Sequence, residues 1–277
     1  MPLDAFALAL GSAFLHALWN LILGRERDPG GATAIALVVS IVVFAPVAAL
    51  RWDADAEVWP FVAVTSALQL LYFALLATAY TRAPVSVVYP IARGLAPVIV
   101  LVVGVTVLGT GAAAAQVVGV CLVGLGVLLV RGLGSDRADR STGAAYGVAV
   151  ATSIAAYTLV DAHGVEHADP IVYLELGMIP ATLGYVAFLV VARDGAVRMR
   201  EAARPLPALA GLLSFAAYAM VLGALLLAPA ASVAAVRETS VLIAALLAAP
   251  LARERVGPLR LAGATLVVAG VALIALG

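Results

Sequence analysis

The stretch YPIARGLAPV, residues 89–98, determines which class of protein this chain belongs to. It lies in an apolar run that begins at Pro84 and is long enough to cross a bilayer, since a membrane helix needs about 20 apolar residues. Arg93 nevertheless sits roughly 14 Å into that run, at 1.5 Å per residue. An arginine at such depth is costly and normally faces a protein interior or a water-filled cavity. The stretch therefore predicts a membrane protein with a polar interior.

The composition of the whole chain supports the same class. Of its 277 residues, 64% are hydrophobic and 12% are charged, whereas a soluble domain has about 45–50% and about 25%. The formal net charge is zero, and no basic run carries interleaved aromatic residues, so we expect no nucleic-acid partner. Cys121 is the single cysteine, which excludes an intrachain disulfide framework and a cysteine metal cluster.

Enzyme motifs are missing from the sequence. All 16 basic residues are arginine, and without a lysine there is no Walker A loop to bind a nucleotide and no Schiff base. The H-E-x-x-H and G-x-S-x-G motifs and an aspartate-rich pair are also absent from the printed sequence. We therefore expect no catalytic residue, no metal and no cofactor, and a protein that is not an enzyme.

Short charged or Gly/Pro breaks divide the chain into ten apolar stretches. They predict an all-α integral membrane protein with ten transmembrane helices. The approximate spans are 3–23, 32–50, 58–80, 84–107, 112–130, 142–161, 171–192, 206–228, 231–251 and 257–276.

The arginines predict how these helices are oriented. Twelve of them fall in the odd-numbered connections, whereas the even-numbered connections contain only Arg51. Loops rich in arginine stay in the cytoplasm. We therefore expect a multi-pass protein of the bacterial inner (plasma) membrane with both termini outside.

The two halves of the chain resemble one another. A shift of 144 residues places Arg93 on Arg237, Gly119 on Gly263, and Gly126 on Gly270. Because each half contains an odd number of helices, the second half enters the membrane upside down. The pattern predicts two inverted five-helix repeats, residues 1–133 (helices 1–5) and 134–277 (helices 6–10), around a central cavity, an architecture found in many secondary transporters.

Arg93 and Arg237 both fall near the middle of the membrane, and Glu238 is the nearest acid in sequence. Two interpretations remain open: the three charges form a buried ion network that only locks the halves together, or they bind a solute or coupling ion. Pro90, Gly94 and Pro97 favour the second interpretation, because prolines within a membrane helix free backbone carbonyls that only protein or a watery cavity can satisfy.

Ten residues are candidates to line the cavity. They are Arg93, Arg237, Glu238, Tyr89, Trp19, Asn20, His16, Tyr72, Tyr157 and Tyr218. Each aromatic residue also has a simple packing explanation. His16 is a candidate for carrying protons, because the unperturbed pKa of histidine lies near neutrality. Glu175 is expected at the outer rim, and His163 and His167 in a connecting loop, where a metal site is the less favoured explanation.

Three segments carry a resemblance to a known family. They are LHALWN (15–20), RAPVSVVYPIARGLAPVIV (82–100) and AAVRETSVLIAALLAAPLARERVGPLRLAGATLVVAGVAL (234–273). They resemble the EamA family of the drug/metabolite transporter (DMT) superfamily, and the similarity runs over nearly the whole chain. The resemblance implies inverted five-helix repeats around a central cavity, and transport of small solutes, often export of amino acids or other metabolites coupled to protons.

The sequence thus favours a secondary transporter, most of all an exporter of amino acids or related organic acids. Its expected partners are a small-molecule solute, protons as coupling ion and the lipid bilayer, and we expect a monomer. Two alternatives remain: an exporter of drug-like or cationic compounds, or a membrane protein or enzyme that uses the same cavity without transport. A carrier needs no nucleophile and no metal, which agrees with the missing motifs.

Overall fold

The protein is described from a computed structural model that covers residues 1–83, 85–131, 137–191, 194–252 and 258–276. For some of these helical residues, Tyr89 and Pro90 among them, the description is limited to the backbone. Within the described residues the fold is all-helical, apart from one isolated β-bridge between Ala54 and Ala168.

The first half contributes five long helices. They are α1 (Leu3–Leu23), α2 (Pro29–Leu50), α3 (Val58–Arg82), α4 (Val85–Thr106) and α5 (Ala114–Arg131). The second half contributes seven helices and one 3-10 turn. They are α6 (Arg137–Gly164), η1 (Val165–His167), α7 (Pro170–Val191), α8 (Gly195–Ala202), α9 (Pro205–Leu225), α10 (Ala230–Arg237), α11 (Ser240–Ala252) and α12 (Pro258–Leu276).

Six helices of the described chain are long and apolar enough to cross a membrane. They are Leu3–Leu23, Pro29–Leu50, Val58–Leu76, Ser141–His167, Pro170–Val191 and Pro205–Leu225. Shorter apolar helices cover Ile91–Thr106, Ala114–Leu129 and Leu261–Ile274. The chain is thus a multi-pass membrane protein, whereas the count of ten spans stays a prediction.

One prediction about helix continuity is confirmed and one is wrong. The fourth span, predicted over 84–107, is a single helix, because α4 runs without a break through Pro90 and Pro97. The ninth span, predicted as one helix over 231–251, is two short helices, α10 and α11, separated at Glu238 and Thr239. The short α8, rich in charged residues, was not predicted.

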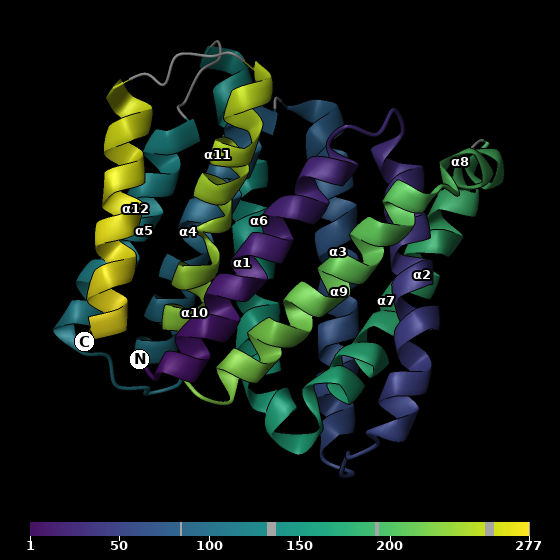
Figure 1. Ribbon diagram of the computed structural model, residues 1–277, viewed down its shortest axis with the longest axis horizontal. Helices are drawn as coiled ribbons and strands as arrows, with labels where there is room; N and C mark the ends of the chain where they lie inside the picture. The colour runs from purple at the N-terminus through teal and green to yellow at the C-terminus, as the bar shows by residue number, and fades with distance from the viewer. Residues whose placement is uncertain (84, 132–136, 192–193, 253–257, 277) are drawn as a thin grey trace.

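Both chain ends lie at the same end of the helix bundle, the lower end in Figure 1. The helices run alternately up and down, so the connection α1–α2, with Arg25 and Arg27, lies at the opposite end together with α8. Arg198 and Arg200 of α8 are therefore at the same end as Arg25 and Arg27. This agrees with the expected separation of the arginine-rich connections from the termini.

Glycines allow α5 and α12 to pack backbone against backbone. A Cβ atom on Gly119 would lie 2.7 Å from the carbonyl oxygen of Gly270, and one on Gly126 would lie 2.6 Å from that of Gly263. Under the 144-residue shift, Gly119 corresponds to Gly263 and Gly126 to Gly270. Gly119 therefore contacts the counterpart of Gly126, and Gly126 contacts the counterpart of Gly119. A two-fold axis between two equivalent elements produces this pattern. The glycines of the repeat are at this interface because larger residues would hold the helices apart.

An ion pair connects α2 and α8 at the arginine-rich end. Arg198 donates to both carboxylate oxygens of Asp28, from Nε at 2.8 Å and from Nη2 at 2.6 Å. This hydrogen-bonded guanidinium holds the pKa of the Asp28 carboxyl below its usual value of 3.8. A bidentate arginine–carboxylate pair fixes geometry as well as charge, so it holds α8 against the start of α2.

Replacing Gly126 by valine should separate α5 from α12 and destabilise the fold. The added methyl groups would overlap the Gly263 carbonyl group, and overpacking of this kind costs about 1–3 kcal/mol. The matched control is Gly111→Val, because a Cβ atom there meets nothing within 4 Å. Thermal unfolding in detergent, followed by size-exclusion chromatography, should show a lower midpoint for Gly126→Val only; equal midpoints would contradict the packing described here.

Replacing Asp28 by asparagine should lower stability at neutral pH and have a smaller effect in acid. The folded-state pKa of Asp28 is depressed, so its contribution is fully present above the unfolded pKa near 3.8 and is lost as the pH falls through the folded-state pKa. We expect about 0.2–1 kcal/mol, the range of partly exposed ion pairs. Melting curves of the wild type and Asp28→Asn at pH 7 and near pH 3 measure the difference between their thermal midpoints. A difference that is larger in acid would contradict a stabilising ion pair at Asp28.

Candidate functional site

A cavity of about 170 Å³ lies between the two halves of the bundle. Leu23, Thr33 and Leu76 line it near the ends of their helices, so the cavity extends from the middle of the bundle toward the arginine-rich end. Seven of the ten predicted residues line it: His16, Trp19, Tyr72, Arg93, Tyr157, Tyr218 and Arg237.

The other three predicted residues lie elsewhere. Asn20 is not among the lining residues, and its side-chain Nδ2 donates to the backbone carbonyl of His16 at 2.8 Å. Glu238 lies behind the cavity wall and is 1% exposed. The side chain of Tyr89 lies outside the described residues.

Arg93 is held by residues from both halves. Its Nε lies 3.0 Å from Oε2 of Glu238, and its Nη2 donates to Nε2 of His16 at 2.9 Å. Nη2 also lies 3.4 Å from Oγ of Ser240. Because a guanidinium can only donate, Nε2 of His16 is the acceptor in this contact. Arg93 therefore connects α4 with α1 and α11, and its charge is matched by a carboxylate.

Arg237 has a different environment. Its side chain is 4% exposed and lines the cavity, and its Nε makes no hydrogen bond. Its Cζ lies 5.9 Å from the centre of the Tyr218 ring, which gives a weak cation–π contact. Within the described part of the chain, no carboxylate oxygen lies within the 4.0 Å of an ion pair. Arg237 thus presents a buried positive charge without a matching anion to the cavity.

The break between α10 and α11 positions these charges. The amides of Glu238 and Thr239 bond to carbonyls three residues back, Ala235 and Val236, so the chain tightens into a turn before α11 begins at Ser240. Arg237 lies at the C-terminal end of α10, where the helix dipole favours a cation, and Glu238 precedes the N-terminal end of α11, which favours an anion. An unbroken helix would offer neither terminus at this depth.

Aromatic side chains form one wall of the cavity. Tyr157 of α6 lies between Tyr72 of α3 and Tyr218 of α9, with ring centres 6.0 Å apart in each pair. Opposite, Trp19 packs edge-on against His16 at 4.8 Å. The indole Nε1 of Trp19 is buried and makes no hydrogen bond. The cavity therefore offers an apolar surface with a few unmatched polar groups, as expected for a small-molecule site.

Two buried acids are not among the ten candidate residues. The span 142–161 places Asp161 at the end of its helix, but α6 continues to Gly164 and Asp161 is 1% exposed. Glu175, expected at the rim, is 5% exposed, and neither carboxyl oxygen makes a hydrogen bond. The expectation for Glu175 is wrong, because α7 packs against α3 near this residue, where Oγ of Ser66 donates to the carbonyl of Gly177 at 2.9 Å. The sequence signal that was missed is Tyr157, one turn before Asp161 on the same helix face.

A second cavity of about 320 Å³ lies toward the end that carries the termini. It is lined by the last turns of α4 and α6, including Leu101 and Leu159, and by the start of α10, including Ser232. Leu101 is two turns beyond Arg93, and Ser232 precedes Arg237 by more than one turn. The two arginines therefore lie between two hollows that face opposite ends of the bundle.

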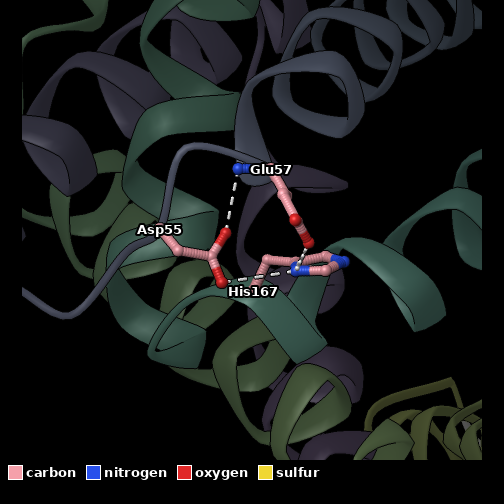
Figure 2. Close-up of side chains that lie close together, drawn as sticks. All are labelled: Asp55, Glu57 and His167. Carbon is pink, nitrogen blue, oxygen red and sulfur yellow. Dashed lines mark hydrogen bonds and ion pairs between the residues drawn. The ribbon is translucent and has the colours of Figure 1, made fainter.

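The connections at the terminus-bearing end are tied together across the halves. Nδ1 of His167 lies 3.4 Å from Asp55 and 3.5 Å from Glu57 (Figure 2). Arg51 adds an ion pair with Asp169 at 2.7 Å. The candidate ligand atoms of Asp55, Glu57 and His167 lie within 4.8 Å of one another, but both acids are exposed, and exposed acids commonly hold no metal. The cluster is explained by its role in joining the connection α2–α3 to η1.

Comparisons with known proteins agree with this geometry. A solved structure titled "Crystal structure of protein" has the same fold, with a TM-score of 0.77 and 15% identity over 100% of this chain and 98% of the other. No curated protein matches the sequence at a significant level.

A family model gives the identification. The model of the EamA-like transporter family matches twice, at residues 5–132 and 141–276, and so covers nearly the whole chain as two repeats. This agrees with the resemblance found in the sequence and with the DMT superfamily. The chain belongs to the EamA-like transporter family.

Proposed function

We propose that this membrane transporter is a secondary carrier that exports amino acids or related organic acids. The observation that carries the proposal is Arg237, a buried guanidinium that lines the cavity without a carboxylate partner among the described residues. A solute carboxylate would supply that anion, because guanidinium binds carboxylate bidentately and does so best where water is excluded.

A carrier must open alternately to the two sides of the membrane. The two cavities on opposite sides of Arg93 and Arg237 suit this requirement. The two-fold pattern of contacts that Gly119 and Gly126 of α5 make with α12 suits it as well. We propose ten spans arranged as two inverted repeats, divided between residues 133 and 134, with α10 and α11 together forming the ninth span. Rocking of one repeat against the other would expose the site in turn.

The other residues that line the cavity indicate what kind of side chain the solute carries. Trp19, Tyr72 and Phe215 offer aromatic surface, and the Nε1 of Trp19 is a donor without a partner. An amino acid with an apolar or aromatic side chain fits this combination. The alternative solute, a cationic drug-like compound, is disfavoured because Arg237 would repel it.

We propose protons as the coupling ion, taken up by a group other than the two that the sequence suggests. Two ionisable side chains suggested by the sequence, His16 and Glu238, are both engaged by Arg93. Protonating Glu238 would leave Arg93 without its counter-charge, and protonating Nε2 of His16 would remove the acceptor of Arg93. Both groups therefore suit a structural role better than a proton-carrying one.

Replacing Arg237 by glutamine should selectively impair transport of carboxylate-bearing solutes. Charge-assisted hydrogen bonds contribute about 1.5–3 kcal/mol, so exchange of labelled L-leucine in proteoliposomes should fall about tenfold or more, and exchange of its amide much less. Equal loss for acid and amide would show that Arg237 does not bind the carboxylate.

Arg93→Gln is the matched control for this experiment. It leaves Glu238 buried without its partner, which costs about 3–5 kcal/mol. We expect a lower thermal midpoint and a loss that does not distinguish acid from amide. If Arg93→Gln were as stable as wild type and selective for acids, the roles of the two arginines would be reversed.

A reporter protein that is active only in the cytoplasm should be inactive when it is fused after Gly277. The connection α1–α2, with Arg25 and Arg27, and α8 lie at the end opposite the termini, and arginine-rich connections stay in the cytoplasm. A second fusion, within the connection between α5 and α6, should be active. Strong activity of the Gly277 fusion would overturn the proposed inner-membrane orientation, although not the repeat.

A further inference from the structure

A buried carboxylate next to the main cavity has only neutral donors around it. Asp161 of α6 is 1% exposed. The hydroxyl of Tyr173 donates to its Oδ1 at 2.8 Å, and the hydroxyl of Tyr218 donates to its Oδ2. Within the described residues no arginine or histidine lies within ion-pair distance. An ionised carboxylate in an apolar interior is costly unless it is paired, so Asp161 is suited to taking up a proton.

The charged and titratable neighbours of Asp161 come from several helices. Tyr173 faces it from α7 and Tyr218 from α9, and α3 contributes the neutral Thr65 and Gln69. Arg237 of α10 and Arg93 of α4 lie farther off along the main cavity, as does Tyr157 of α6. His163 and Glu166 line the second cavity instead.

The space beside Asp161 is too small for a solute. It measures about 10 Å³, which is about the volume needed to hold one water molecule. Gln69, Leu174, Met178 and Tyr218 line both this space and the main cavity. A water molecule could therefore carry a proton between the main cavity and Asp161, whereas an amino acid has no room to reach the carboxylate.

Tyr218 links Asp161 to the proposed solute site. Its hydroxyl bonds to Asp161, and its ring lies 5.9 Å from Cζ of Arg237. The negative charge of an ionised Asp161 attracts Arg237 and repels an arriving carboxylate. Protonation removes that charge, so Arg237 attracts an anion more strongly.

We propose that Asp161 is a proton-binding site whose protonation strengthens binding of a carboxylate at Arg237. The proposal rests on the carboxylate site proposed above for Arg237. Proton and solute then favour one another by the same factor, as reciprocity of linked binding requires, so the two would leave the cell together and the outward solute gradient would drive export. For two charges that interact at an effective dielectric constant near 20, a change on the order of tenfold is expected.

Binding of L-leucine at several pH values tests this linkage. Leucine stays a zwitterion as the pH falls from about 8 to about 5, whereas a buried carboxyl group can change its charge in that range. The affinity of the detergent-solubilised protein should rise about tenfold in acid. Asp161→Asn keeps the shape; its Oδ1 accepts from one tyrosine and its Nδ2 donates to the hydroxyl oxygen of the other, so its affinity should be high and independent of pH.

Glu175→Gln is the matched control, because Glu175 is also a buried acid on the adjacent α7 but does not line either space. It should keep the pH dependence of the wild type. A pH dependence that persists in Asp161→Asn would overturn the proposal. So would a wild-type affinity that follows sodium concentration and ignores pH.

Infrared difference spectroscopy tests the proton site without any solute. The protonated-carboxyl band that appears on acidification should be smaller in Asp161→Asn than in the wild type, and in the Glu175→Gln background the change Asp161→Asn should remove the same component of the band. If the band is unchanged in Asp161→Asn, Asp161 is not the proton site, whatever the protein transports. If the band behaves as expected but leucine and other carboxylates do not bind, the proton site stands while the proposed function and the linkage to Arg237 fail.

Discussion

The ion pair between Arg93 and Glu238 is the contact on which the interior of the bundle depends. Both groups are almost fully buried, with the nitrogen and oxygen 3.0 Å apart. Removing either partner would leave a charge in an apolar medium, which costs several kcal/mol. The break between α10 and α11 is part of this arrangement, because it places Glu238 before a helix N-terminus and brings Ser240 to Arg93.

The two arginines occupy equivalent places in the repeats but have different surroundings. Under the 144-residue shift the counterpart of Glu238 is Gly94. A Cβ atom at Gly94 would lie 2.9 Å from the carbonyl oxygen of Gly124, so a glutamate cannot fit there without moving α5. The repeats therefore provide one adjacent acid for two arginines. Arg93 forms the ion pair with this acid, whereas Arg237 faces the cavity. The proposed solute site therefore lies on the second repeat.

Much of the architecture follows from local pattern. The spans 3–23 and 58–80 differ little from α1 and α3. An apolar run of bilayer length forms a helix, because a helix satisfies the hydrogen bonds of its own backbone inside the membrane. The repeated glycines were also visible in the sequence, and they pack α5 against α12. The helix break at Glu238 was missed, because the run 231–251 is apolar on both sides of the charges. The single span 84–107 agrees with α4, whose packing against α5 and α6 supports a helix that contains prolines.

The sequence by itself determined that the chain lies in a membrane, that it contains two related halves, and that two arginines are buried. These conclusions depend on composition, periodicity and spacing, which are local properties of the chain. Only the tertiary structure decided which arginine is paired, that Asp161 and Glu175 are buried, and that Asp161 reaches Tyr173 and Tyr218. The cost of a buried charge depends on groups brought from other helices within a few ångströms, and linear spacing does not encode those distances.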